Sequence, residues 1–194
     1  MPTARPLSPA LRLLLRPCDR SYRAAHDSGE RRARDIRLVV LHSTEGGTAE
    51  SVAAYFAGSA QASTQLVVDD SGCYRCVPDL VIPWGAPGVN TSGLHVEHCG
   101  FARWSRQEWL AHLPMLERSA AKVARWCYRY SIPRRYVGPL GLKLRRRGLT
   151  THSDASRAFT PGGHTDPGPG FPRDVYLDLV RRFYRELAGA RAAS

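Results

Sequence analysis

Short apolar runs rich in β-branched residues predict most of the strands in the first half of the chain. Residues 36–42 (Ile-Arg-Leu-Val-Val-Leu-His) have the length and composition of a buried strand. Residues 63–69 and 73–77 predict two more strands, which a tight turn at residues 70–72 would join. A shorter run at residues 80–84 is also strand-like.

Residues 94–98 alternate along the chain in the way that a strand with two different faces requires. One face would carry Leu94, Val96 and His98, and the other His95, Glu97 and Cys99. An imidazole and a carboxylate on the same side indicate that this second face is not simply apolar core.

Apolar residues at helical spacing predict four helices. The helix at residues 48–58 begins with a Thr N-cap, and residues 105–108 form a capping box that opens a short helix. Residues 114–130 predict a longer helix with Pro in its first turn, and Pro172 opens a C-terminal helix. Residues 131–149 predict a basic loop.

The order of these elements predicts an α/β fold, a single domain with a central mixed β-sheet flanked by α-helices. A chain of 194 residues is long enough for one such core. We expect the folded domain to span residues 36–190. Residues 1–35 are rich in Arg and poor in periodicity, which predicts a basic N-terminal extension with a short helix near residues 9–15.

The formal net charge of +11 predicts a surface that attracts polyanions. No motif that interleaves basic and aromatic residues is present, so nucleic acid is not a predicted partner. No run of about 18 apolar residues exists, and we therefore expect no membrane insertion. Residues 9–15 are apolar, but Arg12 and Arg16 leave this run too short for a signal peptide.

The cysteines do not form a recognisable framework. Cys73 and Cys76 make a CxxC pair, but no second pair follows, which argues against a zinc ribbon. The odd total argues against a full set of disulfides, and we expect small buried thiols made in a reducing compartment. The five positions are Cys18, Cys73, Cys76, Cys99 and Cys127.

Two histidines and a carboxylate stand at strand ends or in loops. His42 ends the first predicted strand, His152 lies in Thr-His-Ser-Asp, and Asp166 lies in the Gly- and Pro-rich turn at residues 162–172. Such a set, with no fourth protein ligand, makes a catalytic zinc site that keeps one position for water. Zinc is therefore the predicted cofactor, in a groove at the edge of the sheet.

Four segments, in this order and at this spacing, resemble those of one known family. They are Val-Val-Leu-His-Ser-Thr-Glu at 39–45, Leu-His-Val-Glu at 94–97, Thr-His-Ser-Asp at 151–154 and His-Thr-Asp-Pro-Gly-Pro-Gly-Phe-Pro at 164–172. The chain resembles the zinc-dependent N-acetylmuramoyl-L-alanine amidases, a family that includes phage lysozyme-like amidases and peptidoglycan recognition proteins. The resemblance covers about residues 36–185 and is greatest to endolysin amidase domains of phages that infect actinobacteria.

The resemblance implies a peptidoglycan hydrolase that cleaves the amide bond between N-acetylmuramic acid and L-alanine. It implies zinc held by His42, His152 and Asp166, and Glu97 as the catalytic acid and base. For Glu97 the alternative is a charged residue on a solvated strand face. His164 stands where many relatives carry Lys and would stabilise the oxyanion; alternatively, His164 is the ligand and Asp166 supports it.

The resemblance also implies four substrate-binding positions and two departures from the family pattern. Relatives often show Trp-His-Ala where this chain has Trp, Gly and Ala at residues 84–86, and Gln65 replaces a His on the second strand. Both positions would line the groove. A loop Asn of the family matches Asn90, which is equally well explained as a turn residue. The predicted substrate-binding residues are Thr44, Gln65, Trp84 and Asn90.

The implied biology is lysis of the cell wall from within. Without a signal peptide, we expect synthesis in the host cytoplasm, release with the help of a holin-type partner, and action as a monomer. The positive charge would hold the enzyme on anionic cell-wall polymers. The alternative function is a non-catalytic peptidoglycan-binding protein of the same fold.

Overall fold

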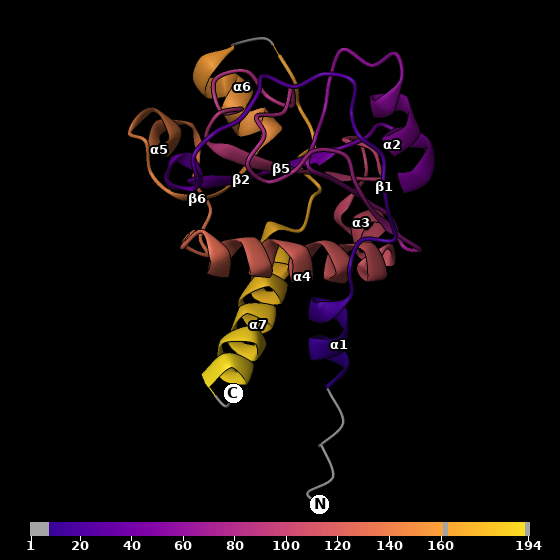
Figure 1. Cartoon of the computed structure of the whole chain (residues 1–194), viewed down its shortest axis with the longest axis vertical. Coiled ribbons are helices and arrows are strands. Elements are labelled where there is room, and N and C mark those ends of the chain that lie inside the picture. Colours follow the sequence, from indigo (N-terminus) through magenta and orange to yellow (C-terminus); the bar gives the residue numbers. More distant parts are fainter. Residues whose placement is uncertain (1–7, 161–162, 193–194) are drawn as a thin grey trace, which may run out of the picture.

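The computed structural model describes residues 8–160 and 163–192, and within them a six-stranded mixed sheet forms the centre of the fold (Figure 1). Strand order across the sheet is β1-β4-β3-β5-β2-β6. Only β3 and β4 pair antiparallel, and the other neighbouring strands run parallel. The strands are β1 (Arg20–Ser21), β2 (Leu38–Ser43), β3 (Leu66–Val68), β4 (Cys73–Arg75), β5 (Gly93–His98) and β6 (Gly148–Thr151). The predicted central mixed sheet is confirmed.

Helices cover both faces of this sheet (Figure 1). On one face the long helices α4 and α7 pack together with α1, and on the other lie α2, α5 and α6. The helices are α1 (Pro9–Leu15), α2 (Ala49–Ala57), α3 (Arg106–Ala111), α4 (Leu113–Arg129), α5 (Pro139–Lys143), α6 (His152–Phe159) and α7 (Arg173–Ala192), with a short 3-10 turn η1 (Ala33–Asp35). In the described part of the chain, no helix is long and apolar enough to cross a membrane.

The alternation of side chains along β2 places its last histidine. Val39 and Leu41 belong to the core beneath α4 and α7, whereas Leu38 and Val40 pack on the other face, with residues of α6. Since successive side chains of a strand point to opposite faces, His42 continues the row of Leu38 and Val40. It therefore lies on the same face of the sheet as α6.

The four predicted helices are confirmed with small shifts of their ends. Thr48 caps α2 by accepting a hydrogen bond from the Ser51 amide, and Ser105 and Glu108 form the expected capping box of α3. The apolar stripes predicted for the two longer helices are buried in α4 and α7. Local capping and periodicity are thus sufficient to predict these elements.

Two short segments differ from the prediction. The expected loop at residues 131–149 contains α5 and the start of β6, because pairing with β2 (Leu38 opposite Gly148) organises a stretch that has almost no apolar pattern. The strand-like run at 80–84 forms only one isolated bridge, between Glu30 and Val81. Pro83 lacks the amide hydrogen that a longer ladder needs.

The N-terminal segment packs on the rest of the fold from residue 8 onward: α1 lies against α4 and α7, and β1 pairs with β4 at the edge of the sheet (Figure 1). Residues 1–7 lie outside the described part. The predicted short helix is confirmed as α1, and its Leu14 is fully buried in the main core. The buried guanidinium of Arg31 donates hydrogen bonds to the carbonyl oxygens of Asp79, Asn90 and Gly93. The proposed domain boundary at residue 35 thus separates two parts that share one core.

Candidate active site

Three potential metal ligands converge at the carboxyl ends of the parallel strands. His42 lies at the end of β2, and His152 opens α6 directly after β6, the strand that pairs with β2. Asp166 lies in the loop between α6 and α7, and its carbonyl oxygen accepts a hydrogen bond from the Ser153 amide. This bond ties the loop to the first turn of α6.

The donor atoms of these residues lie close together, and the two imidazoles face different oxygens of the Asp166 carboxylate. His42 Nδ1 lies 3.1 Å from His152 Nδ1 and 3.2 Å from Asp166 Oδ2, and His152 Nδ1 lies 3.1 Å from Asp166 Oδ1. Ligands about 2.0–2.1 Å from a tetrahedral zinc ion lie about 3.4 Å apart. All three side chains are buried. The residues present therefore fit a zinc ion bound by two imidazoles and one carboxylate.

Charge and burial support the same conclusion. Burial lowers the pKa of His42, which keeps the ring neutral and able to ligate. Burial alone would raise the pKa of Asp166, but hydrogen bonds from His152 and His42 hold it well below its ordinary range, so the carboxylate is ionised. Two imidazoles beside an ionised carboxylate are a typical donor set for zinc.

His95 holds the ring of His42 from behind, a contact that the sequence prediction missed. Its Nδ1 lies 3.0 Å from His42 Nε2. A His42 ring that ligates through Nδ1 carries its proton on Nε2 and donates it to His95. Burial holds the pKa of His95 well below its ordinary value, so its ring stays neutral and can accept this bond.

The glycine at position 85 makes room for His95. A Cβ built on Gly85 would lie 2.4 Å from His95 Nδ1, so any side chain there would collide with the ring. The departure from Trp-His-Ala and the presence of His95 are thus one structural feature. The sequence signal that could have predicted this contact is the alternation of residues 94–98, which places His95 and Glu97 on one face of the strand.

Glu97 lies beside the ligand cluster on β5. Its Oε1 is 3.7 Å from His42 Nδ1, and its Oε2 is buried without a hydrogen-bond partner among the described residues. Burial raises the pKa of Glu97 well above its ordinary value, and the nearby carboxylates of Asp166 and Glu45 add to this effect. The side chain is largely buried, which excludes the solvated strand face.

His164 approaches the cluster from the solvent side. Its ring stacks on that of His152, with centroids 4.0 Å apart, and its Nδ1 lies 3.6 Å from Asp166 Oδ1. The His164 side chain is 66% exposed, whereas Asp166 is buried with its oxygens facing His42 and His152. This geometry favours Asp166 over His164 as the metal ligand and leaves the His164 ring exposed to solvent beside the cluster.

Two glycines fix the loop that carries Asp166. Gly168 has φ of +88°, and a Cβ on it would lie 1.8 Å from the carbonyl oxygen of Ala102. A Cβ on Gly170 would lie 2.0 Å from the carbonyl oxygen of Trp104. The loop therefore packs backbone against backbone, which explains the Gly-Pro-Gly sequence after the aspartate.

One predicted groove residue is wrong. Gln65 is completely buried, its amide nitrogen donates to the Val81 carbonyl, and its amide oxygen accepts from the His95 amide. It supports the strand that carries His95 and presents no surface to a substrate.

The other three predicted substrate-binding residues are each at least partly exposed. The Asn90 side-chain oxygen accepts hydrogen bonds from the amides of Gly85 and Ala86, which is the turn role. Trp84 stays 37% exposed and stacks on His26. The Thr44 hydroxyl donates to the Gly46 carbonyl directly after β2.

Comparisons with known proteins agree with this geometry. The family model described as N-acetylmuramoyl-L-alanine amidase matches residues 32–169. No curated protein sequence matches the chain. The matched range includes Glu97 and the three candidate metal ligands, so the match covers the whole candidate site.

Solved structures share the fold at low sequence identity. The chain is similar to the Staphylococcus aureus hydrolase AmiA in complex with its ligand (16% identity, TM-score 0.72, covering 96% of this chain and 95% of that chain). It is also similar to the N-acetylmuramoyl-L-alanine amidase LysC from Clostridium intestinale URNW (14% identity, TM-score 0.55, covering 83% of this chain and 95% of that chain). A third similar structure is a selenomethionine derivative of AmpD (19% identity, TM-score 0.56, covering 83% of this chain and 93% of that chain). The chain therefore belongs to the N-acetylmuramoyl-L-alanine amidase family and is an enzyme that hydrolyses the amide bond between N-acetylmuramic acid and L-alanine of peptidoglycan.

Proposed function

We propose that this amidase is zinc-dependent and that His42, His152 and Asp166 hold the ion. The observation that carries the proposal is the convergence of two imidazole nitrogens, 3.1 Å apart, on the Asp166 carboxylate, whose two oxygens lie 3.1 and 3.2 Å from them. These separations suit one small tetrahedral cation. When bound, zinc would supply a Lewis acid that polarises the substrate carbonyl and acidifies the attacking water. Family membership supports zinc as the metal.

Glu97 is the proposed proton carrier of the reaction. Its Oε2 has no protein partner among the described residues, although it is buried beside the cluster. From this position the carboxylate can accept a proton from the attacking water as the water bonds to the carbonyl carbon. It can then return that proton to the amine nitrogen of L-alanine as the amide bond breaks.

His164 is the proposed oxyanion donor. Its ring stands over the edge of the cluster against His152 and remains largely exposed, so a substrate carbonyl can reach an imidazole N–H there. Rigid packing of the loop through Gly168 supports a fixed position for this donor.

Metal binding tests the proposal directly. Apo protein titrated with Zn²⁺ in a calorimeter should bind one ion per chain, and His152→Ala should abolish tight binding while far-ultraviolet circular dichroism shows the fold retained. Tight, stoichiometric zinc binding by His152→Ala, or no zinc binding by the wild type, would sink the assignment.

We also propose a biological setting for this activity, in which the positive charge helps to hold the enzyme on the cell wall. A net charge of +11 favours retention on anionic cell-wall polymers, which would serve an enzyme released onto the wall. An endolysin-type role, with release by a holin and action as a monomer, completes the proposed setting. If added protein lysed host cells without being retained on their walls, retention by charge would not be needed for lysis, and this part of the proposal would fail.

A further inference from the structure

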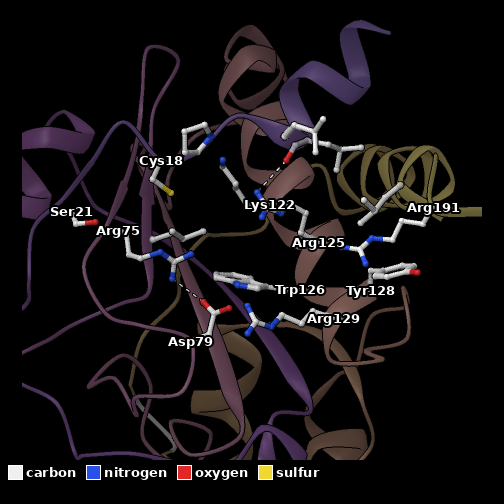
Figure 2. Close-up of a pocket in the computed structure, with 15 residues that line it drawn as sticks. Cys18, Ser21, Arg75, Asp79, Lys122, Arg125, Trp126, Tyr128, Arg129 and Arg191 are labelled. Atoms are coloured by element: carbon white, nitrogen blue, oxygen red, sulfur yellow. Dashed lines mark hydrogen bonds and ion pairs between the residues drawn. The ribbon is translucent and has the colours of Figure 1, made fainter. Parts of the chain in front are cut away.

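A second chemically distinctive place lies on the opposite face of the sheet from His42. There a cavity of about 720 Å³ opens between α1, α4, α7 and the edge of the sheet (Figure 2). Figure 2 shows Cys18 at this cavity, with Arg75 and Lys122 reaching into the same space. Asp79 is its one acidic lining residue, and it already pairs with Arg75. The cavity is therefore cationic around a solvent-reachable thiol.

The Cys18 thiol contacts a second thiol. Its Sγ lies 3.0 Å from Cys73 Sγ, at the start of strand β4. The backbone holds this approach from both sides, because the Asp19 amide donates to the Cys73 carbonyl and the Cys73 amide donates to the Asp19 carboxylate, each at 2.7 Å. A disulfide bond is about 2.05 Å long, so the two sulfurs need only about 1 Å of further approach.

The surroundings make Cys18 the nucleophile of this pair. The hydrogen bond from Cys73 lowers the pKa of Cys18, and the charges of Lys122 and Arg75 lower it further, against opposing effects of burial and of Asp19. Lys122 is 6% exposed and donates to the Arg16 carbonyl, so its charge is fixed beside the thiol. A thiolate in a cationic, partly exposed site is the reactive form of cysteine.

The remaining cysteines have no such environment. Burial raises the pKa of each of them to about 12, which keeps them as thiols at neutral pH. They are Cys76, Cys99 and Cys127.

We propose that Cys18 and Cys73 form a reactive dithiol that a low-molecular-weight disulfide closes to an intramolecular disulfide bond, fastening the N-terminal segment to strand β4. The Cys18 thiolate attacks one sulfur of the oxidant, forms a mixed disulfide and expels one thiolate. Cys73 then loses its proton and attacks the Cys18 sulfur, which expels the second thiolate. The two electrons and both protons end on the two product thiols.

Closure would stabilise the enzyme once it leaves a reducing compartment. The bond would join positions 55 residues apart and restrict the unfolded chain accordingly. For a chain of this size we expect the melting temperature to rise by roughly 5–15 °C. A dithiol reductant should reverse the rise. This inference does not depend on the zinc proposal, since the pair lies on the other face of the sheet.

The test is oxidation of the native protein with glutathione disulfide at neutral pH. Intact mass spectrometry should show loss of two hydrogen atoms without a retained glutathione, and non-reducing peptide mapping should identify one cross-link, between Cys18 and Cys73. Cys73→Ser should instead retain one glutathione on Cys18. Cys127→Ala, the matched control, should form the Cys18–Cys73 disulfide at the wild-type rate. In both proteins this disulfide should form on the order of tenfold or more faster than any remaining thiol reacts with glutathione disulfide.

Opposite results overturn the proposal. They are a stable glutathione adduct on wild-type Cys18, a cross-link that involves Cys76 or Cys99, or oxidation that begins only under unfolding conditions. Peptide mapping of the wild type gives the answer even if a variant fails to fold.

Discussion

His42 and Glu97 are direct register partners on the neighbouring parallel strands β2 and β5, with 3.7 Å between His42 Nδ1 and Glu97 Oε1. One hydrogen-bond ladder therefore fixes both the proposed metal ligand His42 and the proposed proton carrier Glu97. Side chains placed on adjacent rigid strands keep their separation better than side chains on loops. The arrangement separates metal binding from proton transfer, which substitutions can test.

Replacing Glu97 with Gln should remove turnover and leave metal binding intact. The amide has the same shape but cannot accept and return a proton, so kcat should fall by roughly 10²–10⁴-fold. Zinc content of the purified variant, measured by atomic absorption, should equal that of the wild type. Wild-type activity in this variant would remove Glu97 from the mechanism.

His164→Ala distinguishes an oxyanion donor from a metal ligand. If His164 stabilises the oxyanion, kcat should fall by roughly 10–10³-fold while the zinc Kd stays unchanged. His164→Lys should recover part of the rate, since an ammonium can donate to the same oxygen. A large loss of zinc affinity in His164→Ala would instead make His164 a ligand.

Gly85→Ala should weaken metal binding without touching a ligand. The new Cβ would lie 2.4 Å from His95 Nδ1 and push the ring away from His42. Loss of such a supporting hydrogen bond raises the zinc Kd by roughly 10–100-fold. Calorimetric titration of apo protein measures it.

Gly138→Ala is the matched control for that substitution, because a Cβ there meets nothing within 4 Å. Its zinc Kd should equal that of the wild type. Equal affinities for both variants would show that His95 does not position His42.

Binding to cell walls should weaken steeply with salt if charge holds the enzyme there. Exposed charges farther apart than about 10 Å are largely screened at 0.1 M salt. Sedimentation of inactive Glu97→Gln with purified walls, between about 0.05 M and 0.5 M salt, measures retention. Salt-insensitive retention would assign binding to contacts with the peptidoglycan itself.

The sequence marks His42 and Asp166 as candidate ligands because both belong to distinctive local segments. His42 ends an apolar strand, and Asp166 lies among glycines and prolines that its loop packing requires. The helices followed from capping and periodicity in the same way.

The sequence predictions that differ from the structure concern tertiary contacts, which leave no local pattern in the sequence. Gln65 is buried because it bonds Val81 and the amide of His95, partners that lie 16 and 30 residues away. The pairing of β6 with β2, which carries His152 to His42, likewise depends on a strand with little apolar pattern. Such contacts exist only once the sheet has assembled.

Digestion of purified peptidoglycan, with mass spectrometry of the products and with or without a zinc chelator, tests the central claim most directly. The account predicts release of peptides that begin with L-alanine, together with peptide-free glycan, loss of this release in chelator, and recovery on adding Zn²⁺. Cleavage at a different bond, or the same cleavage undiminished after the metal has been removed, would contradict it.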